Sequence, residues 1–389
     1  MNKEKKVIKK TDWQSSFTLI GTPKINEDYT FKINEHSEKS SWIYNSMNLG
    51  VDCGERHGVI YCEMMGGYSE ENENRIFAHG KKDDGTDDFE KQVIVDWEDR
   101  FDDKVLEEIG DLSFITVGLE KTDKGQTFYK KFLSAYDAIA YVKEHLTEDM
   151  VVNIRGNLKY STYNDVTQVR KNITNIALSK VDNASDYKAT FVQSVLLDRD
   201  SASLKDIDRD KSAMLVNAKV LDYVKEINGI EVKGQYPYNK QFEFELNLEN
   251  EKQCKTIYEK LFRVKKGVTQ ITFEGDFIEG GAVVTATLED LPEDIREFVN
   301  MGLYTEEEAC AKCTANGSRE RRMVLKKPHI KLVGDDKIPV VQKFEERYTE
   351  DDLVLDYLYD FNEANDDEVP FNEDVESSSN EDLDWLSKL

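Results

Sequence analysis

Two stretches of similar pattern decide the fold, VVNIRGNLKYSTYNDVTQVRKNITNIALS at residues 151–179 and VTQITFEGDFIEGGAVVTATLEDL at residues 268–291. Each begins with apolar residues at alternate positions, which predicts a strand. Each strand is interrupted by a central glycine, Gly156 or Gly275, where a bulge or sharp bend is the usual physical reason. A turn and a second apolar strand follow. An offset of 119 residues aligns Val152, Ile154, Gly156 and Leu158 with Ile271, Phe273, Gly275 and Phe277.

A helical segment precedes each of these hairpins. In residues 134–146 apolar side chains recur at helical spacing, and Ser134 with Asp137 forms an N-cap signal. Residues 249–267 form the second helical segment. Strand-like segments precede the first helix at 58–68, 92–97 and 111–120, and the second at 213–224, 227–232 and 241–248.

Three strands, a helix and two strands is the order of the OB fold, a small Greek-key barrel. The sequence therefore predicts a mainly β (α+β) chain with two OB-fold-like five-stranded barrels, each with a helix before its last hairpin, followed by a disordered acidic tail. The expected domains are an N-terminal arm or edge strand at 1–46, barrels at 47–182 and 183–300, a helical and basic extension at 301–344, and the tail at 345–389.

Charge is concentrated in the tail. From residue 345 onwards, 17 acidic residues face only Arg347 and Lys388, so 15 of the 26 net negative charges lie there. The remaining net charge of −11 is spread over residues 1–344 and does not exclude an anionic partner.

No apolar run approaches the ~20 residues of a membrane span, and the first residues lack an apolar signal core. The five cysteines are odd in number and sparse, which is typical of reduced thiols. We expect a cytoplasmic protein that does not contact a membrane.

Catalytic motifs are not found. The sequence has no phosphate loop, no GxGxxG after a strand and no HExxH, and its five histidines show no paired spacing. A nuclease built from scattered carboxylates is the remaining enzymatic alternative. Cys310 and Cys313 have the spacing of half a zinc site, but two more ligands are not evident, and the pair fits a helix better. We expect no enzyme activity, no metal and no other cofactor.

The hairpin at 151–180 carries the strongest functional signal, because basic and aromatic residues alternate along it. Binding of a single nucleic-acid strand needs cations for phosphates and flat aromatic faces for bases. The alternative is that the tyrosines pack and the charges only confer solubility. The predicted contact residues are Arg155, Lys159, Tyr160, Tyr163, Arg170 and Lys171, with Phe128, Tyr129 and Lys131 as secondary candidates.

Other segments give weaker signals. Trp42, Tyr44, Tyr61 and Tyr68 either present rings to a groove or fill one. The second hairpin has acidic residues where the first has basic ones, so the second barrel is expected to bind less, or to bind protein. Further cations for phosphate contacts are Arg319, Arg321, Arg322, Lys326 and Lys327.

The acidic tail contains a short apolar stretch, Val369-Pro370-Phe371, directly after three acids. This stretch resembles the tip of the disordered arm of bacterial single-stranded DNA-binding proteins, which ends in acids and an apolar-Pro-Phe group. In that family the tip recruits replication and repair enzymes. The resemblance implies partner-binding roles for Asp366, Asp367, Glu368, Val369, Pro370 and Phe371, with Trp385 and Leu386 as a second anchor.

The chain departs from that family in two ways. The family's phenylalanine is the last residue, whereas 18 residues follow Phe371. The family has one barrel per chain, whereas two are predicted here. The larger size and the Lys- and Asn-rich composition look more like the single-stranded DNA-binding proteins of phages and mobile elements.

The predicted function is therefore sequence-tolerant binding and protection of single-stranded DNA during phage replication or recombination, with replication or recombination proteins recruited by the tail. The alternative is an OB-fold protein–protein adaptor in such an assembly, without significant DNA binding of its own.

Overall fold

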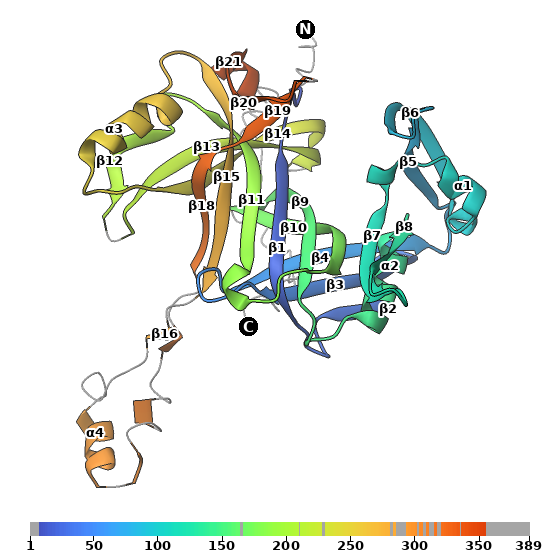
Figure 1. The fold of residues 1–389 in the computed structure, drawn as a ribbon, viewed down its shortest axis with the longest axis horizontal. Helices are drawn as coiled ribbons and strands as arrows, with labels where there is room; N and C mark the ends of the chain where they lie inside the picture. Colours follow the sequence, from blue (N-terminus) through green and yellow to red (C-terminus); the bar gives the residue numbers. More distant parts are fainter. Residues whose placement is uncertain are drawn as a thin grey trace, which may run out of the picture.

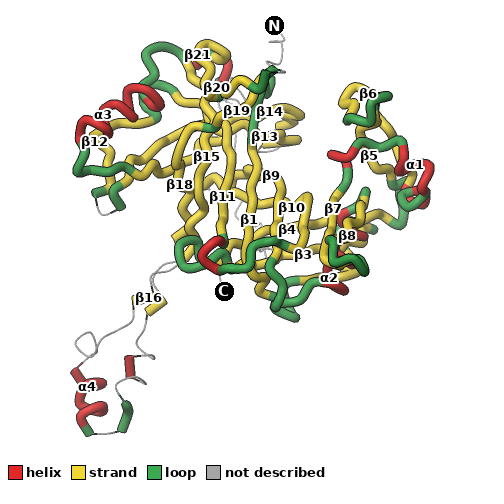
Figure 2. Tube along the Cα trace, in the orientation of Figure 1, coloured by secondary structure: helices red, strands yellow, loops and turns green. Residues whose placement is uncertain are grey.

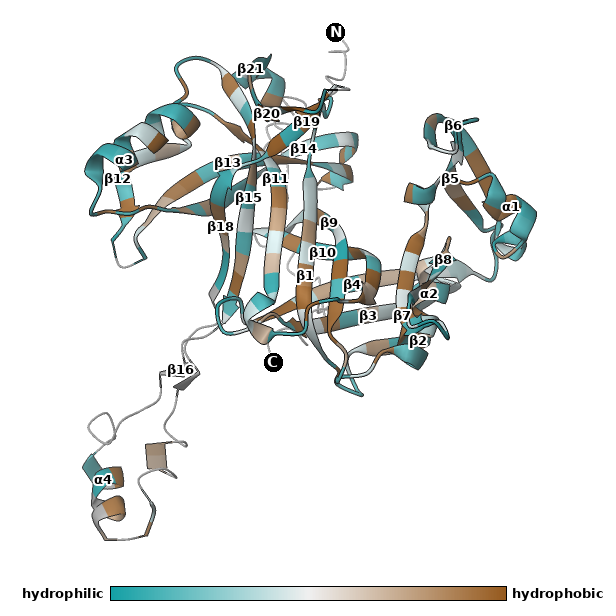
Figure 3. Cartoon of the chain, in the orientation of Figure 1, coloured by the Kyte–Doolittle hydropathy of each residue, from teal (hydrophilic) through white to brown (hydrophobic). Residues whose placement is uncertain are grey.

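The computed structural model describes residues 8–163, 166–209, 211–227, 230–280, 283–284, 293–301, 303–305, 309–310, 315–316, 320–334 and 336–354. The chain is mainly β, with few and short helices (Figures 1 and 2). Most strands belong to one 15-stranded sheet, and bands of hydrophobic and hydrophilic residues alternate along them (Figure 3).

Five strands close into the first barrel. β1 pairs with β3 and β9, β3 with β4, and β9 with β10, all antiparallel, and a parallel bridge between β4 and β10 completes the circle. Helix α2, Ala135–His145, lies in the chain between β4 and β9. The strands are β1 (Ser15–Lys24), β3 (Trp42–Asp52), β4 (Val59–Ser69), β9 (Val152–Tyr163) and β10 (Val166–Leu178).

A second ring has the same pairing order. β11 pairs with β13 and β15, β13 with β14, and β15 with β18, all antiparallel, while β14 and β18 are parallel. Helix α3, Glu251–Ile257, and a π-helical turn at Tyr258–Phe262 lie between β14 and β15. The strands are β11 (Lys188–Leu197), β13 (Ala213–Ile227), β14 (Ile230–Glu245), β15 (Val268–Gly280) and β18 (Glu320–Pro328).

The remaining elements are attached to these two rings. A branch between β4 and α2 contains β5 (Arg75–Lys81), β6 (Asp87–Asp96), α1 (Asp103–Glu107), β7 (Ile115–Lys121) and β8 (Thr127–Phe132). The other strands and the last helix are β2 (Phe31–His36), β12 (Ala202–Asp208), β16 (Val283–Val284), α4 (Glu293–Asn300), β17 (Ala315–Asn316), β19 (Ile330–Val333), β20 (Ile338–Val341) and β21 (Lys343–Tyr348). Single 3-10 turns occur at Trp97–Asp99, Asp111–Ser113, Ala184–Asp186 and Glu350–Leu353.

The predicted hairpin at 151–179 and the helix before it are confirmed. β9 and β10 pair along their length, and Ser134 caps α2 by accepting a hydrogen bond from the N–H of Tyr136 at 3.1 Å. The predicted second hairpin is wrong. β15 pairs with β18, which follows it by about forty residues and places Met323, Val324 and Leu325 in the core.

The position of β1 and of two predicted strands also differs from expectation. β1 lies in the segment expected to be an arm or edge strand, yet strands pair with both of its edges. The predicted strand at 111–120 corresponds to β7, which pairs with β10 and contributes Val117 and Leu119 to the main core. The predicted strand at 92–97 lies in β6 of the branch, beside a small separate core. That core contains the buried side chains of Ala78, Val95, Ile109 and Phe114.

The two interrupting glycines have the same surroundings. Gly156 lies opposite Phe17 of β1, and Gly275 lies opposite Phe191 of β11. A Cβ at Gly156 would lie 1.9 Å from the carbonyl oxygen of Asn172 and 2.7 Å from Cε1 of Phe17. A Cβ at Gly275 would lie 2.3 Å from Cζ of Phe191. In both rings the register of the neighbouring strand shifts at this point, which confirms the expected bulge.

The two rings meet along β1 and β11, which pair antiparallel over six residues. Phe17 lies directly opposite Phe191, the residue at the equivalent position of the second ring. Ser16 pairs with Val192, the residue equivalent to Thr18, and Thr18 pairs with Thr190, the residue equivalent to Ser16. The rings are therefore related by a local two-fold axis near the two phenylalanines, and their buried side chains form one continuous core.

Replacing Gly156 or Gly275 by alanine is expected to lower the free energy of unfolding by about 2 kcal/mol or more, because the new methyl group overlaps a backbone carbonyl or a buried ring. Chemical unfolding followed by circular dichroism measures this. Gly280→Ala is the control: no atom lies within 4 Å of its Cβ position, so we expect a change within about 0.5 kcal/mol. Equal losses of stability in all three variants would contradict the conclusion that Gly156 and Gly275 have no space for a side chain.

Candidate nucleic-acid interface

The residues predicted on β9 and β10 divide between two faces. Arg155, Lys159 and Arg170 are exposed on the outer face, and Tyr163 is exposed at the end of β9. Tyr160 and Lys171 are instead buried, with 5% and 7% of their surfaces exposed. Alternation along a strand places Tyr160 on the same side as Leu158 and Ile154, which are core residues. Tyr160 and Lys171 are therefore structural, not surface contacts.

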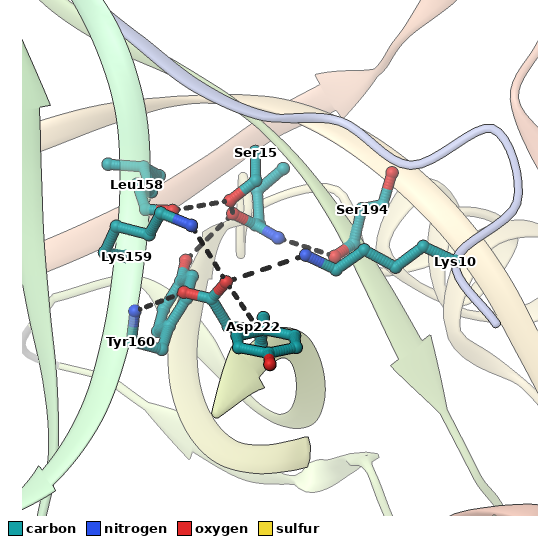
Figure 4. Close-up of polar contacts among 9 residues, drawn as sticks. Lys10, Ser15, Leu158, Lys159, Tyr160, Ser194 and Asp222 are labelled. Carbon is teal, nitrogen blue, oxygen red and sulfur yellow. Dashed lines mark hydrogen bonds and ion pairs between the residues drawn. The ribbon is translucent and has the colours of Figure 1, made fainter. Parts of the chain in front are cut away.

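Tyr160 belongs to a polar network around Asp222 of β13 (Figure 4). Its hydroxyl donates to Oε1 of Gln193 at 2.8 Å, and its backbone N–H donates to Oδ2 of Asp222 at 2.9 Å. The ammonium groups of Lys159 and Lys10 lie 3.4 Å and 3.7 Å from Oδ1 of Asp222. Burial, and secondarily the charge of Asp222, raises the pKa of Tyr160. This network joins β9 of the first barrel to the second ring.

Lys171 makes a second connection between the rings. Its ammonium group lies 2.6 Å from Oε1 of Glu279 on β15, and both side chains are buried. The same ammonium lies 4.8 Å from the ring centroid of Phe277. A cation and a carboxylate that are both buried need each other as partners, so this pair holds β10 against β15.

The exposed cations line up with an aromatic side chain across the outer face of the first barrel. Lys159 lies opposite Arg170 in the pairing of β9 with β10. On the other edge of β10, Asn172 lies beside Glu63 of β4. Continuing this parallel register by two residues in each strand places Arg170 beside Tyr61. The side chain of Arg170 lies 3.7 Å from the carboxylate of Glu63.

Tyr61 continues this row onto β3, because it lies opposite Gly50. A Cβ at Gly50 would lie 3.3 Å from Cε1 of Tyr61, so the ring lies against the glycine. Tyr44 also lies opposite a glycine, Gly67, on the same face. The half-buried Tyr44 and Tyr61 thus form part of the outer surface, and Tyr68 instead packs against Trp97 at 5.2 Å between ring centroids. The sequence signal for these outward tyrosines is a glycine at the opposite position of the paired strand, Gly50 for Tyr61 and Gly67 for Tyr44.

The secondary candidates lie on β8, two strands away from β10. β7 pairs with β10 on one edge and with β8 on the other. Phe128 and Tyr129 are about half exposed, at 48% and 53%. Lys131 donates a hydrogen bond to Asp111 at 2.9 Å, and this bond lowers the pKa of Asp111. β8 therefore carries two exposed aromatic side chains, and the charge of Lys131 is balanced by Asp111.

The cations of the second ring are paired with acids. Arg322 binds Glu243, Lys326 binds Glu245, and Lys327 lies 3.0 Å from Glu274. Arg321 lies 3.9 Å from Glu279. Arg319 lies outside the described residues. In the first barrel, Lys159 and Arg170 likewise lie beside acids, Asp222 at 3.4 Å and Glu63 at 3.7 Å.

The expected partner-binding residues of the tail, Asp366 to Phe371 with Trp385 and Leu386, lie outside the described residues, as does Cys313. Cys310 is half-buried near Ala309, Ile295 and Val299. In the described part of the chain, no three His, Cys, Asp or Glu residues are grouped so as to hold a metal ion. No described helix is both long and apolar enough to span a membrane.

No family model matches the chain, and no curated protein matches its sequence. Among solved structures, it is similar to a deletion mutant of the single-stranded DNA binding protein from Thermus aquaticus, with 9% identity and a TM-score of 0.29. The match covers 69% of this chain and 87% of the other. A TM-score this low does not establish a common fold.

Replacing Asp222 by alanine is expected to lower the free energy of unfolding by about 3 kcal/mol or more, because a buried N–H group and the Lys10 ammonium lose their partner. Thermal or chemical unfolding measures this. Asp111→Ala removes a carboxylate from an exposed pair with Lys131 and is expected to cost less than about 1 kcal/mol. Similar losses in both variants would show that Asp222 does not hold the rings together.

Proposed function

We propose that this chain is a non-catalytic protein that binds single-stranded DNA with little sequence preference, and that its two rings are OB barrels. Three observations support the OB assignment: the parallel pairing of β4 with β10, the parallel pairing of β14 with β18, and a helix before the fourth strand of each ring. OB folds bind oligonucleotides on the face of strands 2 and 3 and on the loops next to it. In the first barrel, strands 2 and 3 are β3 and β4.

The row of Lys159, Arg170 and Tyr61 across β9, β10 and β4 is the observation that carries this proposal. Two cations suit adjacent phosphates, and the tyrosine face suits an unstacked base, whose stacking contributes roughly 1–3 kcal/mol. Of this row, Tyr61 lies on strand 3, and Arg170 and Lys159 lie on strands 5 and 4, which follow strand 3 around the barrel. Arg155 and Tyr163 extend the same hairpin along the proposed path.

Glu63 reduces the positive charge of this surface. Its carboxylate lies beside Arg170, and it is expected to repel a phosphate at the same position. Burial raises the pKa of Glu63, although the charges of Arg170 and Lys171 act in the opposite direction. Glu63 is thus expected to take up a proton at a higher pH than an ordinary glutamate, and affinity for DNA then rises.

The wider role proposed for the chain is protection of single strands during phage replication or recombination in the bacterial cytoplasm. In this proposal the acidic tail recruits partner proteins through Asp366–Phe371 and through Trp385 and Leu386. The acidic composition of the tail and its apolar-Pro-Phe stretch support this.

A protein–protein adaptor is the second candidate. The paired cations of the second ring favour it, because Arg322 and Lys326 are already bound to Glu243 and Glu245. In that case DNA contributes nothing to the role of the chain. Titration of the whole protein with labelled oligo-dT at low and moderate salt separates the candidates: no binding at low salt would reject the DNA-binding proposal.

Replacing Tyr61 by alanine is expected to weaken binding of oligo-dT by roughly 1–3 kcal/mol, because a stacking surface is lost. Fluorescence polarisation measures the dissociation constant. Tyr223→Ala is the matched control, since Tyr223 is half exposed on β13 of the second ring, and its affinity should stay that of the wild type. Equal effects of the two substitutions would show that the face of β3 and β4 is not the binding surface.

Replacing Glu63 by glutamine is expected to tighten oligo-dT binding two- to fivefold at pH 7.5, about the value of one exposed ion pair. The wild type should gain affinity as the pH falls through the raised pKa of Glu63, and the variant should lack this part of the gain. Polarisation titrations between about pH 5 and 8 measure both effects. Glu90→Gln on β6 is the control, and an identical pH profile in all three proteins would reject the role of Glu63.

A further inference from the structure

β19 and β20 form a small sheet of their own, separate from the two rings. Their register pairs Ile330 with Val341 and Val333 with Ile338. All eight residues of the two strands are exposed, including six large apolar ones whose exposed fractions range from 39% to 58%. These are Ile330, Leu332, Val333, Ile338, Val340 and Val341.

Both faces of this hairpin are apolar. Cross-strand partners lie on the same face, so Ile330 and Val341 share one face with Leu332 and Pro339. The other face combines Val333 and Ile338 with Lys331 and Val340. A two-stranded hairpin is at best marginally stable alone in water, and stability requires further strands or a covering surface. The base of this hairpin is tied to β15, where the N–H of His329 donates to the carbonyl of Thr272 at 2.8 Å, but its two apolar faces are exposed.

The two edges of the hairpin differ. Pro339 has no N–H, and a proline inside a strand is tolerated where its nitrogen faces away from the pairing partner. The outer edge of β20 therefore lacks a donor in its middle. Among the described residues, only β20 pairs with β19, so the other edge of β19 offers its backbone groups for pairing.

We propose that β19 pairs with β19 of a second copy of this chain, antiparallel about a two-fold axis, to form a four-stranded sheet. A two-fold contact needs a self-complementary surface, and an apolar hairpin with one open edge has this property. Charge does not oppose it: within residues 330–341, Lys331 and Lys337 balance Asp335 and Asp336, although the whole chain carries a net charge of −26.

Antiparallel pairing also places the tip of one hairpin at the base of the other. Asp336 at the tip then lies near Lys327 of the second copy, whose side chain is 69% exposed. Edge pairing leaves both faces of the new sheet open, so complete cover of the six half-exposed side chains of both copies, roughly 400–700 Å² of apolar surface, is an upper limit to the area that it buries. This is less than the ~1,200 Å² of a stable interface, so the dimer is weak and forms at high protein concentration.

Sedimentation velocity of the full chain tests this between about 5 and about 500 μM, the range expected for a weak interface. The wild type should shift from monomer to dimer, and Leu332→Glu should remain monomeric throughout. Ile94→Glu is the matched control, because Ile94 is exposed to a similar extent in the separate hairpin of β5 and β6, and this variant should dimerise like the wild type. A wild type that stays monomeric, or a Leu332→Glu variant that dimerises normally, would overturn the proposal.

Hydrogen exchange at the two ends of this concentration range identifies what covers the hairpin. Amides of β19 should gain protection only at the high concentration. Equal protection at both concentrations would mean that another segment of the same chain covers the hairpin, and would overturn the proposal. Loss of dimerisation in Ile94→Glu instead of Leu332→Glu would assign the contact to β5 and β6, and would overturn it as well.

Discussion

The packing of a phenylalanine against a glycine is the constraint on which both rings depend. Phe17 lies over Gly156 and Phe191 over Gly275, each time between the first and fourth strands. The ring takes the space of a side chain that the glycine lacks, and the adjacent strand bulges at the same level. Because the two phenylalanines also lie opposite each other, closure of each ring and the junction between the rings are fixed at one place.

The sequence predicted what is local and missed what is distant. The hairpin of β9 and β10, helix α2 with its Ser134 cap and the equivalence of Gly156 and Gly275 were all readable from spacing. The pairing of β15 with β18 was not, because about forty residues separate them and an apolar pattern does not specify its partner strand. β11 was not predicted as a strand, and β1 was expected only as an arm or an edge strand, although strands of both rings pair with it.

The burial of the candidate site residues was also only partly predictable from the sequence. Alternation along β9 predicts that Tyr160 faces the same side as Ile154, but a sequence does not tell where a barrel ends and a free hairpin begins. The inner side of β9 stays covered beyond the first barrel because Asp222 and Tyr238 of the second ring lie against it. Tyr160 therefore became a core residue, while Arg170, one position from the buried Lys171, kept its place on the surface.

The repeat also explains why two similar rings can differ in chemistry. Tyr160 and Glu279 occupy equivalent positions, four residues after the glycine of each ring, and both face the junction. Tyr160 hydrogen-bonds Gln193 of the second ring, whereas Glu279 binds Lys171 of the first. Glu279 thus neutralises Lys171 of the β9–β10 hairpin. In the second ring, Arg322 and Lys326 are bound to acids of the same ring. On the outer face of the first barrel, Arg155 is exposed, and the charges of Lys159 and Arg170 are partly offset by Asp222 and Glu63.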